Sequence, residues 1–100
     1  MSLMSKVQAL IAGITSPRVR LDVAGTINFL YELYASGRIN EEQLRSDLFE
    51  ICFEVIAMSN PDLMDEEIRE RTGIVVDDLV RTMKIEGVRR RMIARFTSRY

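Results

Sequence analysis

The stretch MDEEIRERTGIVVDDLVRTMKIEGVRRRMIAR, from Met64 to Arg95, carries the strongest signals for fold and function in this chain. Gly73 lies in its first half. Glycine is the natural residue just past the C-terminus of a helix, because it takes a positive φ at no steric cost. Asp77 can then cap a new helix that begins at Asp78. The stretch therefore predicts a helix, a glycine turn and a second helix.

Apolar side chains stand where two such crossing helices would share a core, at Ile68, Ile74, Leu79 and Met83. This layout resembles the helix-turn-helix of DNA-binding regulators over about residues 66–84. The resemblance implies that the second helix reads the major groove of DNA. The pattern departs at Arg69, where a small residue is usual, and in the two carboxylates that open the second helix close to the phosphates. An ordinary corner between two helices of a bundle is the alternative interpretation.

The apolar pattern changes phase in the second half of the stretch. One helical face carries apolar residues as far as Met83, and a nearly opposite face carries them from Ile85 to Phe96. We therefore expect either a helix break around residues 84–87, which Gly87 favours, or a helix that packs on two sides. Apolar and polar residues also alternate near the end, as in the wing-like hairpin of a winged helix. The good helix formers Arg, Met and Ala favour a helix over residues 85–100.

Cap signals divide the rest of the chain into helices. Ser16 before Pro17 and Asn40 before Glu41 are typical of helix N-termini, and Gly37 should end the helix between them. Apolar residues at spacings of three and four support these segments. The predicted helices before Gly73 span residues 5–15, 17–36, 41–58 and 61–72.

The fold class predicted from these signals is all-α, a compact bundle of five or six helices. One hundred residues make a single helical domain, residues 1–100. Within it we expect a helix-turn-helix-like unit over residues 61–84 and a basic C-terminal segment over residues 85–100. Residues 1–3 resemble an expression scar, because Met4-Ser5 repeats the start of the chain.

Composition indicates an ordinary globular protein. Apolar residues make up 47% of the chain and charged residues 29%, which argues against disorder. Cys52 has no second cysteine to pair with and lies in an apolar run, so we expect it to be buried. The sequence shows neither a secretory leader nor an apolar run of membrane-span length, so we expect a cytoplasmic protein without a membrane association.

Charge is distributed very unevenly along the chain. Residues 1–80 hold seven Lys/Arg against fourteen Asp/Glu, a balance of −7, whereas residues 81–100 hold seven against one, a balance of +6. A basic end of this kind is typical of a nucleic-acid-binding segment, and the alternative is neutralisation by acids of the same domain or of a partner. The candidate nucleic-acid-binding residues are Arg81, Lys84, Arg89, Arg90, Arg91, Arg95 and Arg99.

Catalysis has little support in the sequence. The chain contains no histidine and no glycine-rich phosphate loop, so we predict no catalytic residue, no cofactor, no metal site and no small-molecule substrate. The leading interpretation is a small nucleic-acid-binding helical protein that contacts DNA or RNA, such as a transcriptional regulator or a nucleoprotein component. The alternative is a protein–protein interaction or assembly subunit with a basic docking end and no nucleic acid. Apolar residues all round the helix over residues 17–36, and six methionines, also predict a homo-oligomer.

Overall fold

The computed structural model describes residues 2–97, and these residues form four α-helices and no strand. The helices are α1 (Leu3–Ile11), α2 (Pro17–Ala35), α3 (Glu41–Ser59) and α4 (Asp65–Thr97). The predicted all-helical class is confirmed for the described residues. The predicted number of five or six helices is wrong, because the last third of the chain forms one helix instead of two or three.

Local sequence signals set the ends of α2 and α3 as predicted. The Ser16 hydroxyl accepts a hydrogen bond from the Val19 amide, and Pro17 opens α2. The Asn40 side chain accepts a hydrogen bond from the Gln43 amide in the same way at the start of α3. Gly37 follows α2 with a φ of 78°, the left-handed conformation that glycine adopts without steric cost.

The helix α4 corrects the prediction for residues 61–97. It begins at Asp65 rather than Pro61, and it runs without interruption through Gly73 and through Gly87. The glycine turn of the helix-turn-helix layout over residues 66–84 is therefore not formed, and neither is the break at residues 84–87.

The physical reason for this continuity is burial along one face. The residues of α4 that are buried between Ile68 and Met83 recur at helical spacing across Gly73, so one unbroken helix keeps them all in the core. A glycine inside a helix costs only about 1 kcal/mol relative to alanine, which this burial outweighs. The wing-like hairpin is excluded for residues 85–97, which are helical. The remaining residues of the segment expected over 85–100 lie outside the described part of the chain.

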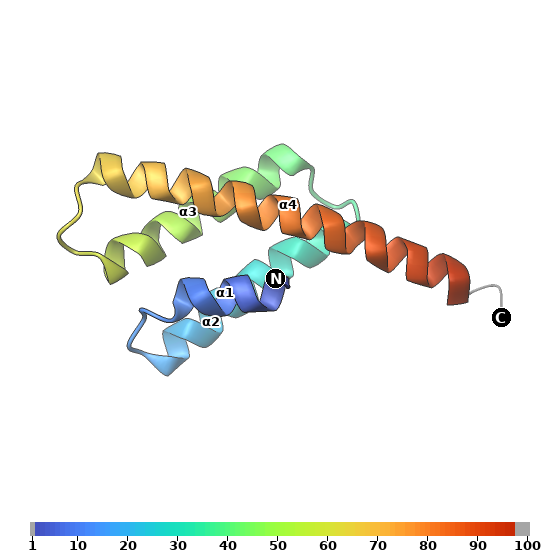
Figure 1. Cartoon of the computed structure of the whole chain (residues 1–100), viewed down its shortest axis with the longest axis horizontal. Helices are drawn as coiled ribbons and strands as arrows, with labels where there is room; N and C mark the ends of the chain where they lie inside the picture. The colour runs from blue at the N-terminus through green and yellow to red at the C-terminus, as the bar shows by residue number, and fades with distance from the viewer. Residues whose placement is uncertain (1, 98–100) are drawn as a thin grey trace.

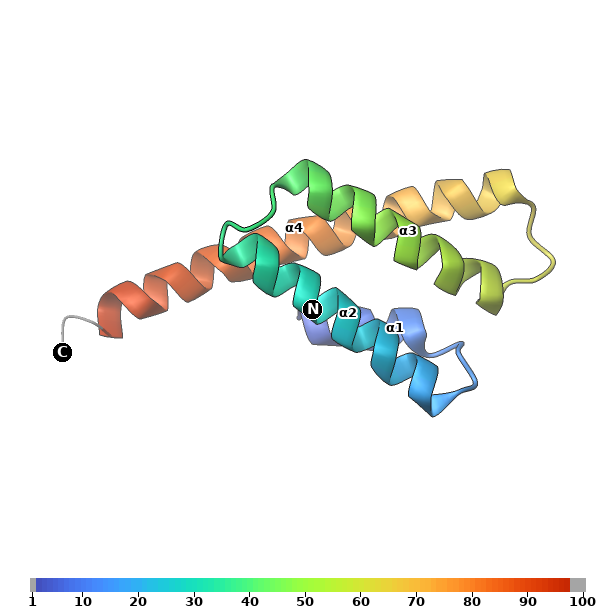
Figure 2. The same ribbon diagram turned by 180° about the vertical axis from the view of Figure 1, so that it is seen from behind.

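The four helices pack as two pairs (Figure 1). The helices α3 and α4 run antiparallel beside each other and make the most extensive contact in the molecule, while α1 and α2 form the second pair. The C-terminal part of α4 extends beyond the other three helices, as the reverse view in Figure 2 also shows. The molecule measures 55 × 27 × 22 Å along its principal axes, and this projecting end lies along the longest of them.

The core lies between the two pairs and receives side chains from every helix. Its fully buried apolar members come from α2, α3 and α4: Ile27, Leu44, Leu48, Cys52, Val55, Leu79, Val80 and Met83. Leu3 of the supposed expression scar is buried in the same cluster. Among residues 2–97, no helix combines the length and the apolar composition that a membrane span needs.

Cys52 is buried with none of its surface exposed, as the sequence predicted. Burial disfavours the thiolate and raises the pKa of Cys52 to about 12. We expect the native protein at pH 8 to react with an aromatic disulfide reagent at least about a hundredfold more slowly than the urea-unfolded chain. A stopped-flow labelling trace would test this, and native labelling at the unfolded rate would contradict a buried thiol.

Candidate functional site

The helix α4 changes character after Met83, where the neighbouring helices no longer cover it. Between Ile68 and Met83, the residues on one face of α4 are buried against α1, α2 and α3. No side chain from Lys84 to Thr97 is buried, and every one from Val88 to Thr97 is exposed. The last three turns of α4 therefore have no buried side chain, and the buried half of the same helix holds them in place.

This projecting half carries an apolar stripe. Its members are 48–56% exposed: Ile85, Val88, Met92 and Phe96. At 100° per residue these four fall within an arc of about 80°, on the side of α4 opposite the face that enters the core. We call these four residues the outer stripe. The sequence contained this signal as the change of phase. The structure forms neither the expected break nor packing on the second side, because α4 is continuous and the outer stripe is exposed in the described residues.

Two of the predicted nucleic-acid-binding residues, Lys84 and Arg90, form ion pairs with residues of other helices. The Lys84 ammonium group bonds to the carboxylate of Glu41 on α3. The Arg90 guanidinium group donates two hydrogen bonds to Glu32 on α2, at 2.8 and 3.2 Å, and lies 5.0 Å from the centre of the Tyr31 ring. These contacts lower the pKa of Glu41 and of Glu32 below that of an ordinary glutamate. Both cations thus attach α4 to its neighbours.

The other predicted residues are spread around the helix. Arg89 and Arg91 are exposed and form no ion pair with the described residues, but at 100° per residue they point about 160° apart around α4. Arg81 lies 4.0 Å from Asp78, and Arg95 is exposed near the end of the helix. Arg99 lies outside the described residues. The seven residues therefore do not form a single basic face.

The charge of α4 reverses along its length. Residues 65–80 hold six Asp/Glu and two Lys/Arg, a balance of −4. Residues 82–97 hold five Lys/Arg and one Glu, a balance of +4. The outward side of the acidic half also exposes one large apolar side chain, Ile74, which is 66% exposed. The first half of α4 is thus acidic, and the second half is basic and carries the exposed outer stripe.

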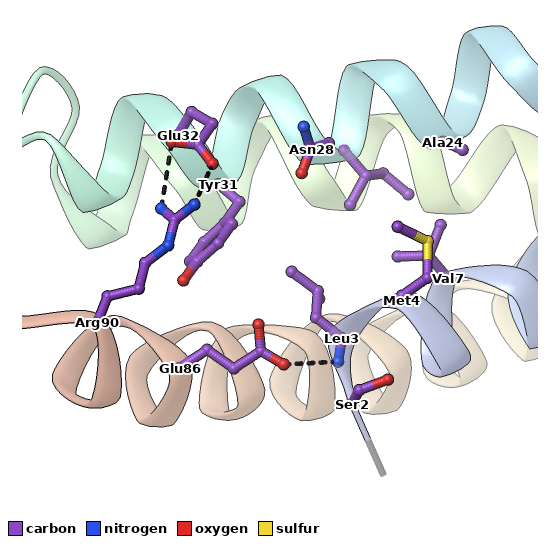
Figure 3. A pocket seen from close by; sticks show the side chains of 11 residues that line it. Ser2, Leu3, Met4, Val7, Ala24, Asn28, Tyr31, Glu32, Glu86 and Arg90 are labelled. Carbon is purple, nitrogen blue, oxygen red and sulfur yellow. Dashed lines mark hydrogen bonds and ion pairs between the residues drawn. The ribbon is translucent and has the colours of Figure 1, made fainter. Parts of the chain in front are cut away.

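A cavity of about 340 Å³ lies where α1, α2 and α4 meet, at the base of the projecting half (Figure 3). Its apolar wall comes from α1 and α2, and its polar wall includes Glu86 and Arg90 of α4. The backbone N–H of Leu3 donates a hydrogen bond of 2.9 Å to Oε1 of Glu86, which joins the start of α1 to α4. The sequence contained no signal for this cavity, because its residues come from three helices far apart in the chain.

Tyr31 in the wall of this cavity has an unusual hydroxyl group. The side chain is only 4% exposed, and its oxygen has no hydrogen-bond partner among the described residues. In Figure 3 the hydroxyl points from α2 toward α4, between Arg90 and Glu86. Burial raises the pKa of Tyr31, and the nearby Arg90 guanidinium group opposes that rise. An unpaired buried hydroxyl is uncommon in native proteins.

In the part of the chain that the structure describes, no three Cys, Asp or Glu side chains lie close enough together to hold a metal ion. Comparison of the chain with protein families, with curated proteins and with solved structures finds no match. The two features that remain for a functional interpretation are the projecting half of α4 and the cavity at its base.

Proposed function

We propose that this chain is an assembly protein that pairs with a second copy of itself through the outward surface of α4. The observation that carries the proposal is the outer stripe, four large apolar side chains about half exposed on a helix whose buried half holds them in place. Contiguous exposed apolar surface of this kind marks interaction sites on soluble proteins. A preformed helix also loses little conformational entropy when a partner covers it.

The charge reversal along α4 favours a second copy in antiparallel orientation. With a two-fold axis at Arg81, residues 82–97 of one copy run along residues 65–80 of the other, so a balance of +4 faces a balance of −4 on both sides of the axis. A parallel pair would instead place like charges together, which opposes association.

The same antiparallel alignment brings apolar groups together. Val88 of each copy comes beside Ile74 of the other, and both side chains lie on the outward side of α4. The 33 residues of α4 form a helix about 50 Å long, so the contact can extend well beyond the stripe itself. Both apolar contact and charge complementarity thus support one occupant, a second copy of the chain.

Sedimentation equilibrium of the unmodified chain tests this proposal. We expect the mass of a dimer at high micromolar concentration, with weaker association as salt screens the opposed charges. A monomer mass over the whole range would contradict the pairing.

A second candidate function is nucleic-acid binding, which the exposed guanidinium groups of Arg89 and Arg91 favour. Arginine forks suit phosphate oxygens, and a helix that lies in the major groove of duplex DNA has a strand on each side of it, so the two arginines need not share one face of α4. Arg90 contributes less in this interpretation, because it pairs with Glu32.

The variant Arg89→Gln/Arg91→Gln tests this second function. We expect it to weaken binding to random-sequence duplex DNA and to reduce the slope of log K against log salt by about two, one unit for each lost phosphate contact. The variant Arg18→Gln/Arg71→Gln removes two exposed arginines elsewhere and is the control. Fluorescence anisotropy across a salt series measures both, and equal slopes for the two variants would contradict a phosphate-binding role.

A further inference from the structure

The cavity between α1, α2 and α4 has the size and the lining of a small-molecule site. Its volume of about 340 Å³ lies within the range of ligand pockets in proteins. Apolar side chains of α1 and α2 form one wall, among them Val7, Ala24 and Ile27. Four of the polar lining residues, Tyr31, Glu32, Glu86 and Arg90, lie toward one end of the cavity, and Asn28 and Ser2 lie apart from them, as Figure 3 shows. An apolar wall with a few convergent polar groups is typical of a binding site.

Two polar groups at that end have unused hydrogen-bonding capacity. Glu86 accepts the Leu3 amide through Oε1, while its Oε2 has no hydrogen-bond partner among residues 2–97. The Tyr31 hydroxyl has no partner in the same part of the chain. Both residues line the cavity and both oxygens can accept a hydrogen bond, but the Tyr31 oxygen is almost completely enclosed by protein atoms.

The charges around the cavity determine which ligand suits it. Glu32 and Glu86 are two negative charges, and Arg90 is one positive charge that is already held by Glu32 in a bidentate pair. The net charge of the lining is thus −1, and the carboxylate without a cationic partner in the described chain is Glu86. A cation that donates hydrogen bonds complements this site, whereas an anion would be repelled by Glu86 and would have to displace Glu32 from Arg90.

We propose that the cavity binds a small molecule in which an apolar ring or chain carries a protonated amine, with the ammonium group against Glu86 Oε2. The apolar part lies along Val7, Ala24 and Ile27. This inference does not depend on the self-association of α4.

An NMR titration with three matched probes tests the proposal: 2-phenylethylamine, 2-phenylethanol and phenylacetate. They share one ring and differ in the charge and hydrogen-bonding character of the polar end. We expect saturable amide shifts at Val7, Asn28 and Glu86 with the amine, weaker binding of the alcohol and no binding of the carboxylate. Absence of saturation with the amine, or tighter binding of the carboxylate, would overturn the assignment.

The variant Glu86→Gln tests the role of the carboxylate. The new amide oxygen can still accept the Leu3 N–H, and the side-chain volume is unchanged, so the fold should be retained. We expect the affinity for the amine to fall at least about tenfold, with little change for the alcohol. Glu42→Gln, at an exposed glutamate on α3, is the control and should bind the amine as the unmodified chain does. Equal affinity of the Glu86→Gln variant for the amine would overturn the proposal.

A second variant tests the cavity without changing charge. Ala24→Leu adds three carbon atoms to the apolar wall and should remove binding of both the amine and the alcohol, while the helical circular dichroism is retained. Amine binding that survives in this variant would place the amine outside the cavity and would overturn the proposal.

Discussion

Replacing Val88 and Met92 by glutamate should convert the protein from a dimer to a monomer without unfolding it. Each replacement removes a large apolar side chain from the outer stripe, where burial of one such side chain contributes about 1.5–3 kcal/mol. A two-fold pair contains each position twice, and each new carboxylate would have to lose water to enter the contact. The dissociation constant should therefore rise by more than about a hundredfold, measured by sedimentation equilibrium.

A matched control distinguishes the outer stripe from other exposed apolar surface. Leu21→Glu/Phe29→Glu introduces the same charges at two positions of α2 that are 74% and 60% exposed. This control should remain a dimer. If it dissociates and the Val88→Glu/Met92→Glu variant does not, the interface lies on α2 and the proposal for α4 is wrong. Both variants should unfold in urea within about 0.5 kcal/mol of the unmodified chain when all three are measured as monomers, because the replaced side chains are exposed.

Charge reversal tests the antiparallel orientation. Glu67→Lys/Glu70→Lys changes the balance of residues 65–80 from −4 to 0, and Arg89→Glu/Arg95→Glu changes that of residues 82–97 from +4 to 0. The antiparallel alignment puts position 67 of one copy beside position 95 of the other, so each variant loses the attraction between the halves and places like charges at this pair. Each should therefore associate more weakly than the unmodified chain, and an equimolar mixture, which puts opposite charges at this pair again, should associate more strongly than either variant alone. Self-association of either variant at unmodified strength would contradict this orientation.

Replacing Met83 by alanine should destabilise the fold more than any exposed change in α4. Met83 is fully buried in the core, and its truncation leaves a cavity that its neighbours fill only in part. Such changes typically lower the free energy of unfolding by about 2–5 kcal/mol, out of a total near 5–15 kcal/mol for a domain. Urea denaturation followed by circular dichroism measures this loss.

Met92 provides the control for this second result, because it is the same residue type nine positions later in the same helix. It is 53% exposed, so Met92→Ala should change the free energy of unfolding by no more than about 0.5 kcal/mol when measured on the monomer. Comparable losses for the two variants would mean that the second half of α4 packs against the core, in conflict with its exposure.

The amino-acid sequence by itself determined the features that depend on neighbouring residues. Ser16-Pro17 and Asn40 begin α2 and α3 where the cap signals placed them, because a cap forms between a side chain and amides only two or three residues away. The burial of Cys52 followed from its apolar surroundings in one helix. The charge difference between the two parts of the chain is likewise a property of composition.

Gly73 is compatible with two structures, the end of a helix and the interior of a continuous one, and the neighbouring residues alone do not favour either. A glycine ends a helix when a turn at that point lets the following residues bury more apolar surface. It stays inside the helix when those residues are better buried by continuing it. In this fold Thr72 and Val76 are buried on both sides of Gly73, so the core stabilises a continuous α4. The same local ambiguity explains why the phase change after Met83 predicted a break as readily as a helix with two faces.

Only the tertiary structure decided which charged groups of the basic end are engaged within the molecule. Glu32 and Arg90 are 58 positions apart in the chain, and Glu41 and Lys84 are also on different helices. Their pairing, like the cavity that Tyr31 and Glu86 share, exists because the packing of four helices brings distant positions together. The sequence specifies each helix through contacts a few residues long, whereas these sites depend on relative helix positions, which the burial of the common core determines.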